Sequence, residues 1–176
     1  NPTGTLIAPA ALKAVWTEVE RRGGTLIMDE IYHGLVYDEP APTALGLSER
    51  VLVVNSFSKY FGMTGWRLGW LVAPDEHIPH LDKLAQNLFL AASTPAQHAA
   101  LAAFAPETLA ILEERRAEFA RRRDYLTAAL RELGFAVPAV PGGAFYVYAD
   151  CTRFGDSGRL AAALLEQAGV AVTPGS

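Results

Sequence analysis

The fold class is decided by the stretch Val51-Leu52-Val53-Val54-Asn55-Ser56-Phe57-Ser58-Lys59. Its first four residues form a continuous apolar run, which is typical of a strand buried on both faces of a parallel sheet. Polar residues follow at once, so this strand ends in a loop that carries hydroxyls and an amine. Residues 25–28 form a similar run that ends at Asp29, and residues 66–73 form a third run that ends at Pro74.

Helical patterns surround these runs. Residues 9–22 carry apolar side chains at three- and four-residue spacing, and a glycine pair ends the pattern. Residues 106–133 form the longest periodic segment, with leucines and a phenylalanine seven apart and arginines paired with acidic residues on the solvated side. A further helix is expected at 158–168. Strands are expected at 145–149 and 170–173, the first pairing with 135–137 across a Pro-Gly-Gly turn. The pattern predicts an α/β fold with a lobe boundary between residues 95 and 106.

The composition excludes several classes of protein. Of 176 residues, 51% are hydrophobic and 19% are charged, which is enough apolar material for a folded core. The net charge of −4 argues against a polybasic binder of nucleic acid or membranes. The single cysteine, Cys151, excludes an internal disulfide framework, and the four scattered histidines suggest no metal site. No apolar run approaches the length of a membrane span, and we expect a cytoplasmic protein.

Candidate site residues follow two of the apolar runs. Ligands bind at the carboxyl ends of parallel strands, where Asp29 and Tyr32 follow one run and Ser56, Ser58 and Lys59 follow the next. Aromatic neighbours are expected to desolvate Lys59 partly, which favours the neutral amine that a Schiff-base nucleophile needs. A lysine that merely extends from a surface loop is the alternative.

Asp29 has two other interpretations. An apolar strand that ends in an aspartate is similar to the magnesium-binding strand of P-loop ATPases, although their G-x-x-x-x-G-K-[ST] motif is absent from these residues. The aspartate could also only cap the backbone amides of Ile31 or Tyr32.

Four motifs, taken together, resemble a known family. They are Asn1-Pro2-Thr3-Gly4, Asp29-Glu30-Ile31-Tyr32, Ser56-Phe57-Ser58-Lys59, and Arg67 eight residues after the lysine. This set resembles the class I/II aminotransferases, the fold-type I enzymes that use pyridoxal 5′-phosphate. Residues 58–70 are the most specific part, and the resemblance covers essentially all 176 residues. It implies that residues 1–105 are part of the large cofactor-binding domain, and that residues 106–176 hold a long linking helix and part of a smaller α+β C-terminal domain.

The resemblance also implies roles for the reacting end of the site. Lys59 forms the Schiff base with the cofactor and then moves a proton between substrate and cofactor. Asp29 forms a salt bridge with the pyridine nitrogen, which keeps the ring an effective electron sink.

The remaining cofactor contacts follow from the same resemblance. Tyr32 and Asn1 bind the 3′ oxygen of the cofactor. Arg67 binds its phosphate, with Ser56 and Ser58 as hydroxyl donors beside it.

We therefore expect these residues to be part of a longer parent protein, a homodimer that moves an amino group between an amino acid and a 2-oxo acid. The segment alone is expected to be inactive, because the phosphate loop and the substrate-carboxylate arginine of the family are absent from it. A β-lyase or synthase of the same fold and a non-catalytic module are the alternatives. The stretch at 142–146 resembles a substrate-proximal segment, but a hairpin turn explains it equally well, and it does not select one amino acid substrate.

Overall fold

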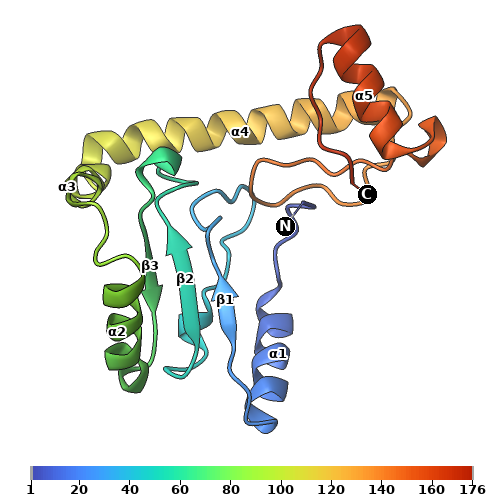
Figure 1. Cartoon of the computed structure of the whole chain (residues 1–176). Helices are drawn as coiled ribbons and strands as arrows, with labels where there is room; N and C mark the ends of the chain where they lie inside the picture. Colours follow the sequence, from blue (N-terminus) through green and yellow to red (C-terminus); the bar gives the residue numbers. More distant parts are fainter. Residues whose placement is uncertain (1, 176) are drawn as a thin grey trace.

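The computed structural model describes residues 2–175, so the predicted cofactor contact of Asn1 lies outside the described residues. Three strands stand between helices α1 and α2, and helix α4 runs across the carboxyl ends of β1 and β2 (Figure 1). The strands are β1 (Ile27–Asp29), β2 (Leu52–Ser56) and β3 (Gly69–Val72). The α-helices are α1 (Pro9–Arg21), α2 (Ile78–Leu88), α3 (Thr94–Ala103), α4 (Pro106–Glu132) and α5 (Ser157–Ala168). Short 3-10 turns lie at η1 (Ala44–Gly46), η2 (Thr64–Trp66), η3 (Asp75–His77) and η4 (Thr152–Phe154).

The sheet has the order β1-β2-β3 and mixed direction. Strands β1 and β2 are parallel, with Asp29 paired to Val54, as the two apolar runs predict. The third apolar run, residues 66–73, was expected to form a parallel strand like the other two. This prediction is wrong, because β3 is antiparallel to β2, with Ser56 paired to Gly69. The connection between β2 and β3 contains no α-helix to carry the chain back to the starting edge, and a parallel neighbour needs such a crossover.

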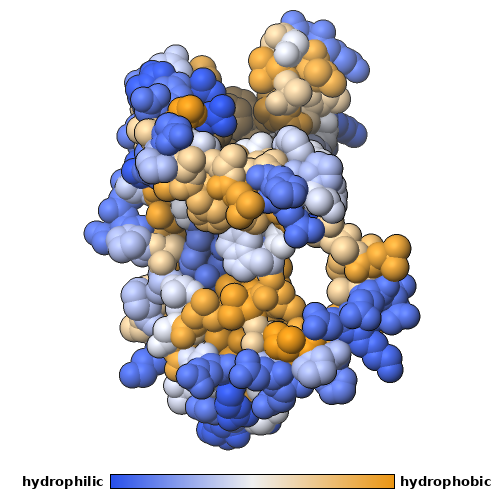
Figure 2. Space-filling model, turned by 90° about the vertical axis from the view of Figure 1, so that its left-hand side faces the viewer, coloured by the Kyte–Doolittle hydropathy of each residue, from blue (hydrophilic) through white to orange (hydrophobic). Residues whose placement is uncertain are grey.

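Buried apolar side chains form two clusters, one between the sheet and α1 and one that joins Phe57 and Met63 to α3. Trp16 of α1 packs against Val51 and Val53 of the second apolar run, and Ala44 closes the cluster. The expected burial of all three runs on both faces is only partly correct. Ile27 of β1 is 63% exposed and every residue of β3 is exposed. Figure 2 shows apolar side chains gathered on the side of the molecule that carries α2 and α3.

The helical predictions agree with the structure to within a residue or two. Leu112 of α4 is buried, but Leu126, and Leu133 just beyond the end of the helix, are exposed. In this helix, acidic neighbours one turn away bind Arg116, Arg121 and Arg122, as in the pair Arg121–Glu118 at 2.6 Å. No helix within residues 2–175 is long and apolar enough to cross a membrane.

The strands expected in the C-terminal part do not form among the described residues. Residues 145–149 and 170–173 are irregular, and one isolated antiparallel bridge joins Ala136 to Asp150. The bridge has the direction expected for the pairing across the Pro-Gly-Gly turn, but one bridge is too short to make a ladder. The division into two domains after residue 105 stays a prediction. The start of α4 at Pro106 is consistent with it.

Arg123 of α4 is the most buried member of an ion pair in this helix. Its side chain is only 10% exposed, and its guanidinium donates to Asp38 at 2.6 Å and to the carbonyl oxygen of Pro141 at 2.9 Å. It also stacks over the Tyr37 ring, 5.0 Å from the centroid. The guanidinium holds the pKa of Asp38 below its ordinary value. Arg123 therefore joins three segments that are far apart in sequence.

We expect Arg123→Ala to lower the free energy of unfolding by about 1–3 kcal/mol, because it removes these charge-assisted hydrogen bonds and leaves a buried carbonyl unpaired. Urea unfolding of the parent protein measures the change. The control is Arg121→Ala, whose side chain is 74% exposed, and which should change stability by less than about 0.5 kcal/mol. Equal losses in the two variants would contradict the special role of Arg123.

Candidate active site

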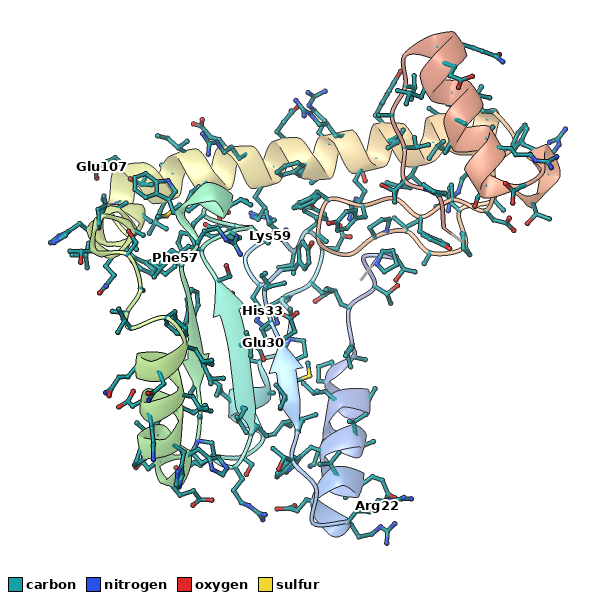
Figure 3. The ribbon with its side chains drawn as sticks, in the orientation of Figure 1. Arg22, Glu30, His33, Phe57, Lys59 and Glu107 are labelled. Atoms are coloured by element: carbon teal, nitrogen blue, oxygen red, sulfur yellow. The ribbon has the colours of Figure 1, made fainter. Side chains whose placement is uncertain are left out.

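The carboxyl ends of the two parallel strands bring the predicted reacting residues to one edge of the sheet. Asp29 is the last residue of β1, and Lys59 lies three residues beyond the end of β2. The Lys59 amine is 5.6 Å from the centroid of the Tyr32 ring and 5.7 Å from that of Phe145. Lys59 lies between the top of β2 and helix α4, above Glu30 and His33 in the same view (Figure 3). Its side chain is half-buried.

The loop after β2 holds the other predicted residues through hydrogen bonds. The hydroxyl oxygens of Ser56 and Ser58 are 2.8 Å apart, and the Ser58 amide donates to the Ser56 oxygen at 3.0 Å. Thr64 donates its hydroxyl to the Ser58 carbonyl oxygen at 2.6 Å, and the Arg67 guanidinium donates to the Thr64 carbonyl oxygen at 3.0 Å. Sequence reasoning missed Thr64, although a hydroxyl residue between the lysine and the arginine was a usable signal.

Arg67 also has an unusual backbone. Its φ of 53° lies in the left-handed region, which residues other than glycine seldom adopt. Just beyond it, a Cβ on Gly69 would lie 2.7 Å from the carbonyl oxygen of Asn55, so only glycine allows β3 to approach β2 here. The side chain of Arg67 is exposed. Strain of this kind is often kept where a residue must present its side chain to a ligand.

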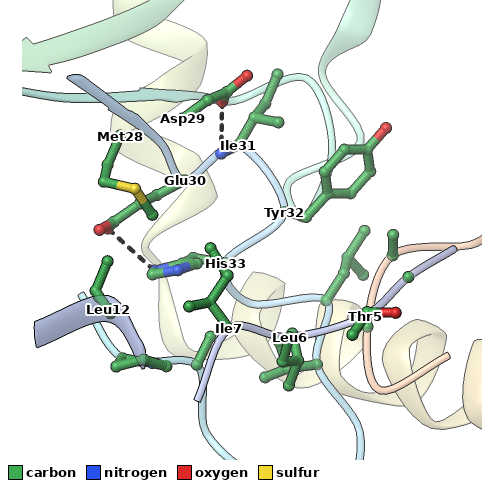
Figure 4. Close-up of a pocket in the computed structure, with 17 residues that line it drawn as sticks. Thr5, Leu6, Ile7, Leu12, Met28, Asp29, Glu30, Ile31, Tyr32 and His33 are labelled. Atoms are coloured by element: carbon green, nitrogen blue, oxygen red, sulfur yellow. Dashed lines mark hydrogen bonds and ion pairs between the residues drawn. The ribbon is translucent and has the colours of Figure 1, made fainter. Parts of the chain in front are cut away.

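A cavity of about 270 Å³ lies beside the end of β1. Asp29 and Tyr32 line one side of it, and Thr5 lies across from them (Figure 4). Gly143 also lines the cavity. Lys59, with the serines and the arginine of the β2 loop, is not among the lining residues. The predicted site therefore consists of two neighbouring groups, and Tyr32 belongs to both.

Asp29 does cap a backbone amide. Its Oδ1 accepts from the Ile31 amide at 3.1 Å, so the capping interpretation is confirmed as a contact. The side chain is nevertheless exposed. A carboxylate has two oxygens and several lone pairs, so the cap leaves it able to bind a further cationic group.

Glu30 is a residue whose role the sequence did not predict. Its carboxylate is only 4% exposed and accepts from the Ala44 amide at 2.7 Å and from the Thr43 hydroxyl at 3.0 Å. His33 Nδ1 lies 3.1 Å from the same carboxylate. Glu30 thus fastens the loop that follows β1 directly beside Asp29. The sequence signal was an acidic residue next to a buried run, where a charge needs partners.

We expect Glu30→Gln to lower the free energy of unfolding by about 1–3 kcal/mol, because an amide places a donor where the carboxylate accepts. Urea unfolding of the parent protein is the measurement. Glu39→Gln is the control, since Glu39 lies exposed in the same loop. An unchanged unfolding midpoint for Glu30→Gln would mean that the buried contacts contribute little.

Tyr60 ties the lysine loop to α4. Its hydroxyl donates to Glu113 at 2.6 Å, and its ring packs so closely on Gly34 that a Cβ there would lie 2.5 Å from it. Burial, with the neighbouring Glu113, raises the pKa of Tyr60 to about 12. The phenol therefore stays neutral at physiological pH and remains a donor, which holds the residue next to Lys59 in place.

The sequence profile of the family "Aminotransferase class I and II" matches residues 1–176. This chain belongs to that family. The predicted resemblance is therefore confirmed, and the interpretation of Asp29 as part of a P-loop ATPase is wrong. The α/β architecture agrees with solved aminotransferases at TM-scores above 0.9.

Several relatives illustrate this membership of the aminotransferase family. The valine–pyruvate aminotransferase of Mycobacterium tuberculosis is 43% identical over 99% of this chain and 46% of its own length. The (5-formylfuran-3-yl)methyl phosphate transaminase of Methanocaldococcus jannaschii is 41% identical, with the same coverage. A putative aminotransferase from Silicibacter pomeroyi has a crystal structure with a TM-score of 0.94 and 45% identity, covering 99% of this chain and 47% of that one. The chain thus spans about half the length of the curated relatives it matches.

The residues present fit the cofactor that this family generally uses. A phosphorylated pyridine aldehyde needs an amine for its aldehyde, an anion for its ring nitrogen, and cationic or hydroxyl donors for its phosphate. Lys59 carries an amine and Asp29 a carboxylate, at adjacent strand ends, that could meet the first two needs. The linked hydroxyls of Ser56 and Ser58, with Arg67 joined to them through Thr64, could meet the third.

Proposed function

We propose that the parent protein is a pyridoxal 5′-phosphate-dependent aminotransferase that moves an amino group between an amino acid and a 2-oxo acid. The observation that carries the proposal is the place of the Lys59 amine beside Tyr32 at the carboxyl edge of β1 and β2. Membership of the aminotransferase family supports it. Because the described chain is about half as long as its relatives, we propose the activity for the parent protein and not for these residues alone.

Pyridoxal phosphate, when bound, supplies an aldehyde that can link to an amine and a ring that withdraws electrons from the α-carbon of a substrate. Lys59 anchors the cofactor and then holds and releases the proton at the α-carbon. Its half-buried position between two aromatic rings limits the water that could compete for this proton. Asp29 keeps a negative charge at the ring nitrogen.

The loop after β2 is proposed to bind the phosphate group of the cofactor. Arg67 offers a planar guanidinium for bidentate contact with phosphate oxygens. Ser56 and Ser58 offer hydroxyls whose positions are fixed by their mutual hydrogen bond and by the Ser58 amide. At the opposite side of the ring, Tyr32 donates to the ring oxygen, and Asn1 is proposed to share that role.

We also propose that the parent protein is a cytoplasmic homodimer. Cys151, the one cysteine of these 176 residues, is free, which suits a reducing compartment. The apolar side chains left exposed on β3 and α2, among them Trp70 and Leu88, need cover that a longer chain and a second subunit together would provide. Light scattering of the purified parent protein tests the dimer, and a monomer at micromolar concentration would refute it.

The test of the activity uses the purified parent protein. We expect it to be yellow and to retain the cofactor on Lys59 after reduction with borohydride, as peptide mapping would show. Mixed with amino acids, it should release a 2-oxo acid only when a second 2-oxo acid is added as acceptor. Ammonia release without an acceptor would instead support the lyase alternative. A colourless protein that takes up no pyridoxal phosphate would refute the proposal.

A further inference from the structure

Two tyrosines that are distant in sequence meet beside Lys59. The hydroxyl oxygens of Tyr32 and Tyr146 are 3.0 Å apart, and their rings meet edge to face with centroids 6.0 Å apart. Phe145 packs against both rings, with centroid distances of 5.6 Å to Tyr32 and 4.8 Å to Tyr146. Tyr32 follows β1, whereas Tyr146 comes from the C-terminal part of the chain. These three aromatic side chains therefore join the loop after β1 to the C-terminal part of the chain, beside the Lys59 amine.

The backbone holds this meeting point firmly. The amides of Gly142 and Gly143 both donate to the carbonyl oxygen of Gly4, at 3.0 and 3.1 Å. The Ala144 amide donates to the carbonyl oxygen of Leu35 at 2.8 Å. Ala144 itself is buried and has a left-handed φ of 59°.

Two side chains, one from the loop after β1 and one from α4, add further anchors. The Tyr37 hydroxyl donates to the carbonyl oxygen of Ala144. Arg123 binds the carbonyl oxygen of Pro141. The segment that carries Tyr146 is thus fixed from both sides over four successive residues, so the contact between the two hydroxyls does not depend on a loose loop.

The number of protons available decides which of the two tyrosine hydroxyls donates to the other. A phenol has one proton to donate and lone pairs with which to accept. Under the proposed function, Tyr32 donates its only proton to the ring oxygen of the cofactor. The 3.0 Å contact with Tyr146 then has to be one in which Tyr146 donates and Tyr32 accepts.

We propose that Tyr146 is a positioning residue, whose hydroxyl donates to Tyr32 and thereby directs the single Tyr32 proton toward the cofactor. This inference rests on the proposed function. A hydroxyl that accepts one hydrogen bond becomes a stronger donor in the next, because the two bonds polarise each other. Tyr146 also fixes the Tyr32 ring in the place where its face meets the Lys59 amine.

The consequence is visible in the bound cofactor. A strong donor to the ring oxygen of the cofactor favours the anionic form of that oxygen. The bound cofactor then loses the proton next to this oxygen at a lower pH. Loss of the Tyr146 hydroxyl weakens that donor. The pH midpoint of the absorption change of the bound cofactor should therefore rise, by about 0.3 to 1 pH unit.

The experiment uses the cofactor-loaded parent protein with Tyr146→Phe, Tyr32→Phe and the double variant. These changes remove only an oxygen and keep the packing of the rings. For each protein, the pH midpoint of the visible absorption and the dissociation constant of pyridoxal phosphate are measured. Tyr125→Phe is the matched control, because Tyr125 is exposed on α4 and undergoes the same chemical change.

We expect Tyr146→Phe to raise the midpoint and to weaken cofactor binding about two- to tenfold, in the same direction as Tyr32→Phe but by less. In the Tyr32→Phe background, the second change should have almost no further effect, because Tyr146 acts through Tyr32. A full additional shift in the double variant, or a wild-type midpoint in Tyr146→Phe, would overturn the inference while leaving the proposed function intact. A wild-type protein that binds no pyridoxal phosphate would overturn both.

Discussion

Lys59→Ala is expected to remove nearly all turnover of the parent protein while leaving non-covalent binding of pyridoxal phosphate in place. The loss of the acid–base group alone lowers a rate by about 10²- to 10⁴-fold. The loss of the covalent anchor adds to this, because the cofactor is then held only by contacts such as those proposed for Arg67 and Asp29. The yellow absorption that depends on the link to Lys59 should disappear.

Stopped-flow and steady-state assays with an amino acid and a 2-oxo acid measure the effect. The visible spectrum and equilibrium dialysis report the cofactor separately, so loss of binding can be distinguished from loss of chemistry. Lys83→Ala is the control, because Lys83 lies exposed on α2, away from the sheet edge. Turnover of Lys59→Ala within tenfold of wild type would remove Lys59 from the proposed role.

The edge of the sheet at which these residues meet was predictable from local pattern. Two apolar runs, each followed at once by polar residues, predict adjacent parallel strands with Asp29 and Lys59 at the same edge, and the register of β1 and β2 agrees. Apolar periodicity likewise predicted α1, α4 and α5 closely. These features depend on residues within one element, and that is the range over which sequence patterns carry information.

Features that depend on distant segments were not predictable in this way. Thr64 and Glu30 matter because of the partners that the fold brings to them, and Tyr146 reaches Tyr32 across 114 positions. The direction of β3 was missed for a related reason. An apolar run indicates a strand, but the direction of pairing depends on the connection that precedes it.

Asp29→Asn is expected to weaken the binding of pyridoxal phosphate at least about tenfold and to lower turnover by about 10²- to 10³-fold, because it removes the charge proposed to face the ring nitrogen. The asparagine keeps a side-chain oxygen that can accept from the Ile31 amide, as Asp29 Oδ1 does at 3.1 Å. Asp29→Ala loses both the charge and the cap, and should add a loss of about 1 kcal/mol in stability to the same loss of turnover. Asp75→Ala, an exposed change at η3, is the control for both.

The pair of variants separates the two interpretations of Asp29. If the carboxylate served only to cap the end of β1, Asp29→Asn would behave like wild type and only Asp29→Ala would show a defect. If the charge itself is needed, the two variants lose turnover alike, and they differ only in urea unfolding. Cofactor titration, steady-state rates and unfolding midpoints for the three proteins decide between these patterns. An asparagine variant with a wild-type rate would assign the ring nitrogen to some other group and leave Asp29 as part of the loop.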